Sequence, residues 1–344
     1  MPDYENKENL AQKNIPLTLQ EGVIGLGMMK EKNNATTDYQ PDRSGIKTLN
    51  KISPIDTGML AEKFQKDPGR CLAFARNNLL SIMQDTRFSK TEKLERLSRY
   101  LDAHFALQIK LDHAAFPADD KIRRGIPDYV PDGLSDMGSD PTIDPSDRFR
   151  EKIRVGKEEI FKLAKPLFTE IFSHDFTGWT AEKIKRYIVD QIGVFIYNEM
   201  PYHEEQDPFP NPEHSIPLVA AHRDRLAICR HHAMYGQVLL QACGITSRLL
   251  KCDVNFHDGQ GSVAHAANLV RIQGKWHLVD YTNPDQNKGI GQVFHAGLQE
   301  TDINLNRKQS YTWNARRKHN NEIYTYTSRN NMYYRIRDNK KDKI

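Results

Sequence analysis

The chain changes its hydrophobic period near residue 245, and this change constrains the fold more than any other feature of the sequence. Residues 226–245 carry apolar side chains on all sides, which predicts a buried helix. Gly244 stands where such a helix ends, because glycine adopts the left-handed conformation that commonly closes a helix.

Three segments after this helix follow the period of strands. Residues 246–254, 263–272 and 275–281 alternate apolar and polar positions and are rich in β-branched residues. Gln273 and Gly274 predict a tight turn between the last two. A buried helix followed by antiparallel strands predicts an α+β fold.

The N-terminal half is expected to be mainly helical. Residues 56–111 predict two helices, the second starting at Ser89, where Glu92 completes a capping box. Residues 148–172 also have helical periodicity, and we expect that helix to break near Pro166. A further helix is predicted over 181–192, with Thr180 as its N-cap. The composition then divides the chain into a disordered leader at 1–54, a helical region at 55–175 with a Pro- and Asp-rich loop at 113–147, a unit of helix and strands at 176–336 and a basic tail at 337–344.

Cys229 falls in the first turn of the predicted buried helix. The partial positive charge of a helix N-terminus, together with Arg230 and nearby histidines, favours the thiolate, which is the reactive form of cysteine. The first-turn backbone amides can also donate to the oxyanion that forms when a thiolate attacks an amide carbonyl. A buried structural cysteine is the simpler alternative for this residue taken alone.

Two polar residues on the predicted strands are candidate partners of Cys229. His265 shares one strand face with Ala267 and Leu269, and Asp280 shares a face of the next strand with Trp276 and Leu278. A hairpin that turns at Gln273 and Gly274 does not place the two polar residues directly opposite. Their contact therefore requires a diagonal approach or a bulge.

These residues resemble the transglutaminase-like branch of the papain-fold superfamily, and also the papain-like domain of plant Raf-like ethylene-response kinases. The resemblance covers about residues 180–285. It rests on Cys229, Ala233, Leu239, Leu240, Gly244, Ile245, Arg248, His265, Asn268, Val270, Gly274, Trp276, Val279 and Asp280.

The resemblance implies a central helix packed on an antiparallel sheet, with Cys229 as nucleophile, His265 as general base and acid, and Asp280 orienting the histidine. It implies a protease, glutamine deamidase or transglutaminase that acts on a protein amide without a cofactor. The upstream oxyanion donor of the family has three candidates, Gln191, His222 and Trp179, and Ile228 stands where the family often has glycine. The alternative is a papain-like module that binds a signalling protein without turnover.

Composition excludes several other classes. No apolar run approaches the roughly 20 residues of a membrane-spanning helix, and a net charge of +4 does not predict nucleic-acid binding. Four scattered cysteines favour a reducing, intracellular site of action, and a polar N-terminus lacks a secretory signal, as in a bacterial effector delivered into a host cell by another route. Cys243, Cys252, His257 and His265 lack the paired spacing of a metal site. The basic, aromatic tail after residue 301 invites an RNA or lipid role, but a strand pair at 323–327 and 332–336 explains it more simply.

Overall fold

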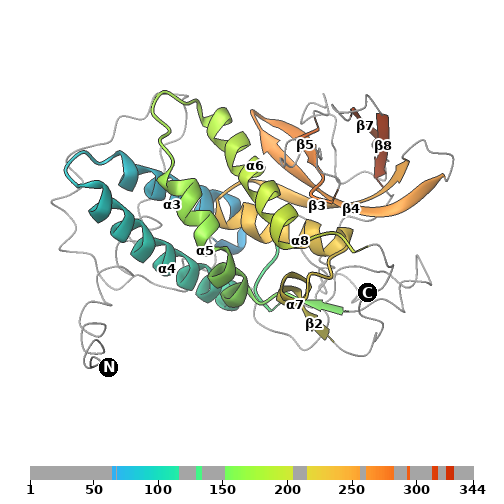
Figure 1. Cartoon of the computed structure of the whole chain (residues 1–344), viewed down its shortest axis with the longest axis horizontal. Coiled ribbons are helices and arrows are strands. Elements are labelled where there is room, and N and C mark those ends of the chain that lie inside the picture. The colour runs from blue at the N-terminus through green and yellow to red at the C-terminus, as the bar shows by residue number, and fades with distance from the viewer. Residues whose placement is uncertain are drawn as a thin grey trace, which may run out of the picture.

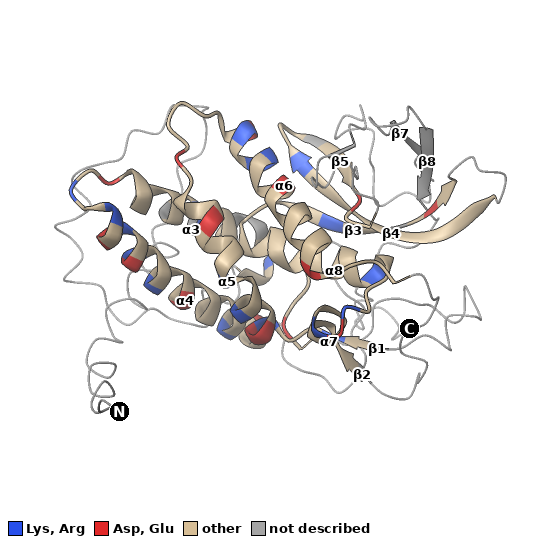
Figure 2. Ribbon diagram, in the orientation of Figure 1, with Lys and Arg blue, Asp and Glu red and all other residues tan. Residues whose placement is uncertain are grey.

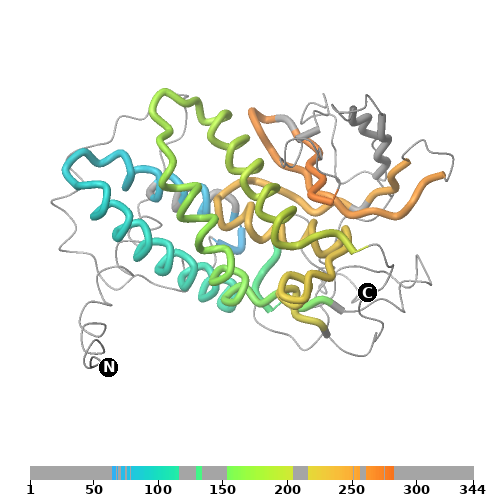
Figure 3. The backbone as a smooth tube through the Cα atoms, in the orientation of Figure 1, coloured from blue at the N-terminus to red at the C-terminus, as the bar shows by residue number. Residues whose placement is uncertain are grey.

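The structure is a computed structural model, and it describes nine stretches of the chain, which are coloured in Figure 1. Figure 3 traces the backbone of the helices and of the central strands as a tube. The nine stretches are residues 64–66, 68–115, 129–133, 152–203, 215–255, 261–282, 293–294, 312–316 and 323–328. Their elements are α3 (Pro68–Gln84), α4 (Lys90–Ala115), β1 (Lys152–Arg154), α5 (Lys157–Ser173), α6 (Ala181–Glu199), β2 (Ser215–Pro217), α7 (Leu218–Arg223), α8 (Cys229–Ala242), β3 (Ser247–Asn255), β4 (Ser262–Ile272), β5 (Lys275–Val279), β6 (Val293–Phe294), β7 (Thr312–Arg316) and β8 (Ile323–Ser328).

Helix α8 lies between the other long helices and the sheet (Figure 1). It contacts α3 and α6 on one side and β3 and β4 on the other. The sheet has the strand order β6-β5-β4-β3-β8-β7, and each neighbouring pair is antiparallel. The fold is therefore α+β, as the change of period predicts.

The central strands follow the sequence pattern closely. β3, β4 and β5 occupy the three predicted segments, and the turn between β4 and β5 has positive φ at both Gln273 (52°) and Gly274 (75°). Two successive positive φ angles define a type I′ turn, whose twist matches that of paired strands. Because such a turn allows one register, Ile272 pairs with Lys275 and Asn268 with Val279.

Both predicted helix caps are confirmed. Ser89 donates its backbone N–H to Glu92 at 2.9 Å, and Glu92 donates its backbone N–H to the Ser89 hydroxyl at 3.3 Å, which is a complete capping box. The Thr180 hydroxyl accepts a hydrogen bond from the backbone N–H of Lys183 at 3.2 Å. The helix that Thr180 opens continues to Glu199, beyond the predicted end, because Ile192 and Ile196 extend its buried face.

The prediction for residues 148–172 is wrong in two respects. Residues 152–154 form β1, which pairs in parallel with β2, and α5 begins only at Lys157. The buried Ile153 and Val155 flank an exposed residue, which is the alternation of a strand. α5 then continues through Pro166 instead of breaking there, because its apolar face is buried on both sides of the proline and outweighs one lost hydrogen bond.

Several other predictions fall outside the described residues. They include the leader at 1–54, the strand at 332–336, the tail at 337–344 and most of the loop at 113–147. β8 covers the predicted strand at 323–327 and pairs with both β7 and β3.

Within the described part, no helix has the length and apolar character needed to cross a membrane. Along α4, Lys and Arg are interspersed with Asp and Glu (Figure 2).

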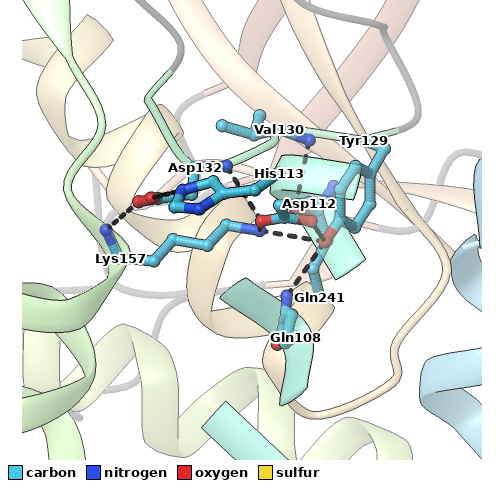
Figure 4. A network of polar contacts seen from close by, with 8 residues as sticks. All are labelled: Gln108, Asp112, His113, Tyr129, Val130, Asp132, Lys157 and Gln241. Carbon is cyan, nitrogen blue, oxygen red and sulfur yellow. Dashed lines mark hydrogen bonds and ion pairs between the residues drawn. The ribbon is translucent and has the colours of Figure 1, made fainter. Parts of the chain in front are cut away.

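A buried polar network joins α4, α5 and the C-terminal end of α8 (Figure 4). The Lys157 ammonium lies 2.8 Å from an Asp112 carboxylate oxygen, and both side chains are fully buried. The Tyr129 hydroxyl donates to the other Asp112 oxygen at 2.5 Å, and Asp132 accepts from the first backbone N–H of α5 at 2.7 Å. Asp132 thus caps α5, a role that the N-cap residue Gly156 has no side chain to fill.

The C-terminal end of α8 is held by segments that precede it by more than a hundred residues. His104 contacts the Ala242 carbonyl at 3.0 Å, and Val130 donates its N–H to the Gln241 side chain at 3.2 Å. Arg76 donates to the Gly244 carbonyl at 2.8 Å. Gly244 closes the helix with φ of 63°, as predicted, and has the Leu72 backbone beside it. One hydrophobic core therefore runs from Leu79 in α3 to Tyr281 after β5.

Candidate functional site

Cys229 is the first residue of α8, with Ile228 as its N-cap. The backbone N–H of Ile228 donates to Nδ1 of His231 at 3.1 Å, which is the reciprocal half of a capping box, because the Ile228 side chain offers no acceptor. Cys229 is partly exposed, whereas residues 231–242 of the helix are all buried. The Cys229 thiol thus lies in the first turn of a helix, where the helix dipole favours an anion.

His265 and Asp280 meet diagonally across the β4–β5 hairpin. The register pairs Asn268 with Val279, which is the last paired residue of β5, and Asp280 follows it. His265 lies further along β4 than the position that would be opposite Asp280. His265 Nε2 nevertheless lies 2.8 Å from Asp280 Oδ2. The sequence allows either a diagonal approach or a bulge, and the structure has the diagonal approach, since the register along β4 is uninterrupted.

The Cys229 thiol completes this arrangement. It hydrogen bonds to the His265 side chain and to the backbone N–H of Ala266. Because Nε2 of the imidazole is bonded to Asp280, the nitrogen that faces the thiol is Nδ1. The structure therefore brings the three predicted residues together in the order thiol, imidazole, carboxylate.

The electrostatics of the pair favour charge separation. Burial alone would raise the pKa of Cys229, but the hydrogen bond and charge of His265, the Ala266 amide and Arg230 lower it below the ordinary value. Burial alone would also lower the pKa of His265, but Asp280 and then Cys229 raise it to about 10. A lowered thiol pKa beside a raised imidazole pKa favours transfer of the thiol proton to the imidazole, which gives a thiolate and imidazolium pair.

The three oxyanion candidates lie in different places. Trp179 precedes the N-terminal end of α6, whereas His232, three residues after Cys229, contacts Met200 at the C-terminal end of this helix. Because 19 helical residues span about 28 Å, Trp179 lies far from the thiol. Gln191 lies in the second half of α6 and is partly buried. His222 contacts α8 directly, because its Nδ1 lies 2.9 Å from the Tyr235 hydroxyl. Trp179 packs in an aromatic cluster with His174, Phe176 and Tyr187.

Two polar residues connect the sheet to α8 behind the site. Asn268 Nδ2 donates to the Ala233 carbonyl at 2.9 Å and to Gln237 Oε1 at 3.1 Å. Gln237 Nε2 in turn donates to the Ser247 carbonyl in β3 at 3.0 Å. Asn268 thus connects β4 to α8. The sequence analysis did not identify Gln237. Its position in a predicted buried helix was the signal, because a buried glutamine needs hydrogen-bond partners.

His232 and Thr282 lie next to the site but were not predicted as site residues. His232 Nε2 contacts the Met200 carbonyl at 2.7 Å, and its Nδ1 lies 3.2 Å from the Thr282 hydroxyl. The backbone N–H of Thr282 donates to Asp280 at 2.9 Å. Within the described stretches, no group of three or more His, Cys, Asp or Glu residues is arranged to hold a metal ion.

No family model matches the chain, and no curated protein matches it. Among solved structures, the chain is similar to a protein of Cytophaga hutchinsonii that is provisionally described as a cysteine protease. The likeness has a TM-score of 0.27 and 20% sequence identity, over 42% of this chain and 45% of the other. The match thus spans less than half of either chain, and a likeness of this size does not establish a shared fold or reaction.

Proposed function

We propose that the chain is a cysteine-dependent acyl-transfer enzyme that acts on protein amides. The observation that supports this most directly is the contact of a helix-terminal thiol, Cys229, with an imidazole that is itself bonded to a buried carboxylate. Cys229 is then the nucleophile, His265 the base and acid, and Asp280 the residue that orients His265. A helix that carries the nucleophile at its N-terminus and packs on an antiparallel sheet is the core expected of the transglutaminase-like branch of the papain fold.

The proposed reaction has two steps. The Cys229 thiolate attacks the carbonyl carbon of a peptide or glutamine amide, and the carbonyl oxygen becomes an oxyanion near the first-turn amides of α8. The His265 imidazolium gives its proton to the departing nitrogen, so that the C–N bond breaks and an amine or ammonia leaves. The product of this step is a thioester on Cys229.

The second step regenerates the thiolate. Neutral His265 takes a proton from water or from a lysine amine, and the resulting nucleophile attacks the thioester carbon and expels Cys229. Water gives hydrolysis of a peptide or deamidation of glutamine, and lysine gives a cross-link. Of the three upstream candidates, His222 is the one we favour as second oxyanion donor, because it contacts α8 through Tyr235. Four free cysteines fit action in a reducing compartment.

Selective alkylation tests the nucleophile. Cys71, Cys243 and Cys252 are buried, and burial raises the pKa of Cys243, so these thiols are internal controls for Cys229. We expect iodoacetamide at pH 6 to label Cys229 first, as located by peptide mass spectrometry. Equal labelling of all four thiols in the folded protein would reject the proposal.

Mass spectrometry of protein substrates separates the reactions. Deamidation adds about 1 Da, cross-linking removes about 17 Da as ammonia, and proteolysis leaves a cut. Cys229→Ala must abolish the change that the wild type produces. If a candidate partner instead binds wild type and Cys229→Ala equally and no substrate changes mass, the chain is a binding module without turnover.

A further inference from the structure

Three parts of the fold meet at His232, one turn into α8. Its Nε2 contacts the Met200 carbonyl at the end of α6, and its Nδ1 contacts the Thr282 hydroxyl beyond β5. A carbonyl only accepts hydrogen bonds, so Nε2 carries the ring proton and Nδ1 accepts from the Thr282 hydroxyl. The ring is buried, which fixes this tautomer because neither nitrogen is left to water.

Thr282 passes this constraint to Asp280. Its backbone N–H donates to Asp280 Oδ1 at 2.9 Å, while Asp280 Oδ2 bonds to His265. The two oxygens of one fully buried carboxylate thus have different partners. A hydroxyl that is held by His232 fixes the orientation of Thr282, and with it the amide that fixes Asp280.

We propose that His232 and Thr282 are positioning residues that lock Asp280 in the orientation at which it bonds His265. The proposal rests on the proposed function, in which that bond keeps His265 protonated beside the Cys229 thiolate. Its chain of contacts runs from the Met200 carbonyl through His232, Thr282 and Asp280 to His265. Burial lowers the pKa of His232 to about 4, which agrees with a neutral ring between a carbonyl and a hydroxyl. The other titratable groups that act on this ring are His231, Asp280 and His265.

The measurement that tests this is the pH midpoint of Cys229 alkylation, because it reports the thiolate and needs no substrate. Thr282→Val removes the hydroxyl and keeps the shape. We expect it to raise the midpoint by about 1 pH unit and to slow alkylation at pH 6 by about tenfold. Thr282→Ser restores the hydroxyl, and we expect it to recover the wild-type midpoint.

The chain offers a matched control at Thr177. Its backbone N–H donates to Asp175 at 2.9 Å in the same two-residue turn, but that turn is exposed and lies between α5 and α6. Thr177→Val should leave the midpoint unchanged. A second pair guards against misfolding of Thr282→Val, because His232→Gln keeps a donor and an acceptor and His232→Leu keeps neither. We expect only His232→Leu to raise the midpoint.

The outcomes are separable. A Thr282→Val or His232→Leu protein that unfolds at a lower temperature but keeps the wild-type midpoint would overturn the positioning role and leave the proposed function intact. A wild type with a low midpoint that turns over no amide would instead reject the proposed function, while the positioning of Asp280 would stand. Substrate assays of the variants then separate an effect on kcat from an effect on KM. A positioning residue lowers kcat and leaves KM nearly unchanged.

Discussion

The ring of Tyr281 lies directly against the backbone of Gly236. A Cβ atom at position 236 would stand 2.4 Å from ring atoms Cδ2 and Cε2 of Tyr281, a separation that real Cβ atoms do not adopt. Tyr281 follows Asp280 in sequence, so this contact sets how closely the end of β5 approaches α8. The absence of a side chain at Gly236 is therefore a condition for the site geometry.

Gly236→Ala is expected to destabilise the protein by about 1–3 kcal/mol, because overpacking forces the buried ring or the strand to move. The same shift should carry Asp280 away from His265 and slow Cys229 alkylation at pH 6. Urea unfolding and alkylation kinetics measure the two effects. Gly156→Ala is the control, since no atom of the described residues beyond its two chain neighbours lies within 4 Å of the added Cβ. Equal unfolding midpoints for the two variants would contradict the prediction.

The alkylation rate of Cys229 should depend on pH through His265. Because the pKa of Cys229 is lowered, its thiolate is present at lower pH than that of an ordinary thiol, whose pKa is about 8.5. In His265→Ala the opposing effect of burial remains, so we expect the alkylation midpoint to rise to about 8.5 or above. Stopped-time labelling from pH 4 to 10 measures it. A midpoint that does not move would show that His265 has no influence on the thiol.

Lys157→Met should destabilise the protein by about 3–5 kcal/mol, because it leaves the Asp112 carboxylate buried without its counter-charge. The double variant with Asp112→Leu should regain most of this loss, which a double-mutant cycle in urea can resolve. Lys165 and Asp102 provide the control, since they also join α5 to α4 at 2.7 Å but are partly exposed. Lys165→Met should cost less than about 1 kcal/mol. Similar losses at both positions would refute the importance of burial.

Asn268→Asp exchanges an amide donor for an oxygen at a position that faces two acceptors. The new carboxylate oxygen would meet the Ala233 carbonyl and Gln237 Oε1, so we expect a loss of about 2–3 kcal/mol from unsatisfied buried groups. Differential scanning calorimetry should show the lower melting temperature. Asn198→Asp on the exposed end of α6 is the comparison and should have little effect. A stable Asn268→Asp protein would mean that this link does not hold the sheet to α8.

The elements nearest the site could be predicted because their signals are local. The apolar run of α8, the alternation of β3 and β4 and the caps at Ser89 and Thr180 each depend on residues within one or two turns. The strand β1 was missed because three residues give too short a pattern, and its partner β2 lies about sixty residues later. Pro166 misled the prediction because a local rule was overridden by tertiary burial.

The same distinction applies to the site. The position of Cys229 on α8 follows from the sequence, whereas the diagonal contact of His265 with Asp280 depends on the sheet twist and on side-chain reach. Lys157 and Asp112 look like surface residues in the sequence, since buried charges are rare and their pairing joins two helices. His232 gave no signal of its own, because its role depends on Met200 and Thr282 from two other elements.

The contacts at the C-terminal end of α8 bear on whether the proposed site can form in a fragment that lacks the preceding helices. His104, Val130 and Arg76 all bond to the last residues of this helix or to the glycine after it, and all three precede residue 176. A fragment that starts at 176 would carry every proposed catalytic residue and yet lose these partners, leaving helix-end carbonyls and apolar surface uncovered. We therefore expect that residues 176–336 do not fold as an independent unit, and that the proposed site requires the helices that precede it in the chain.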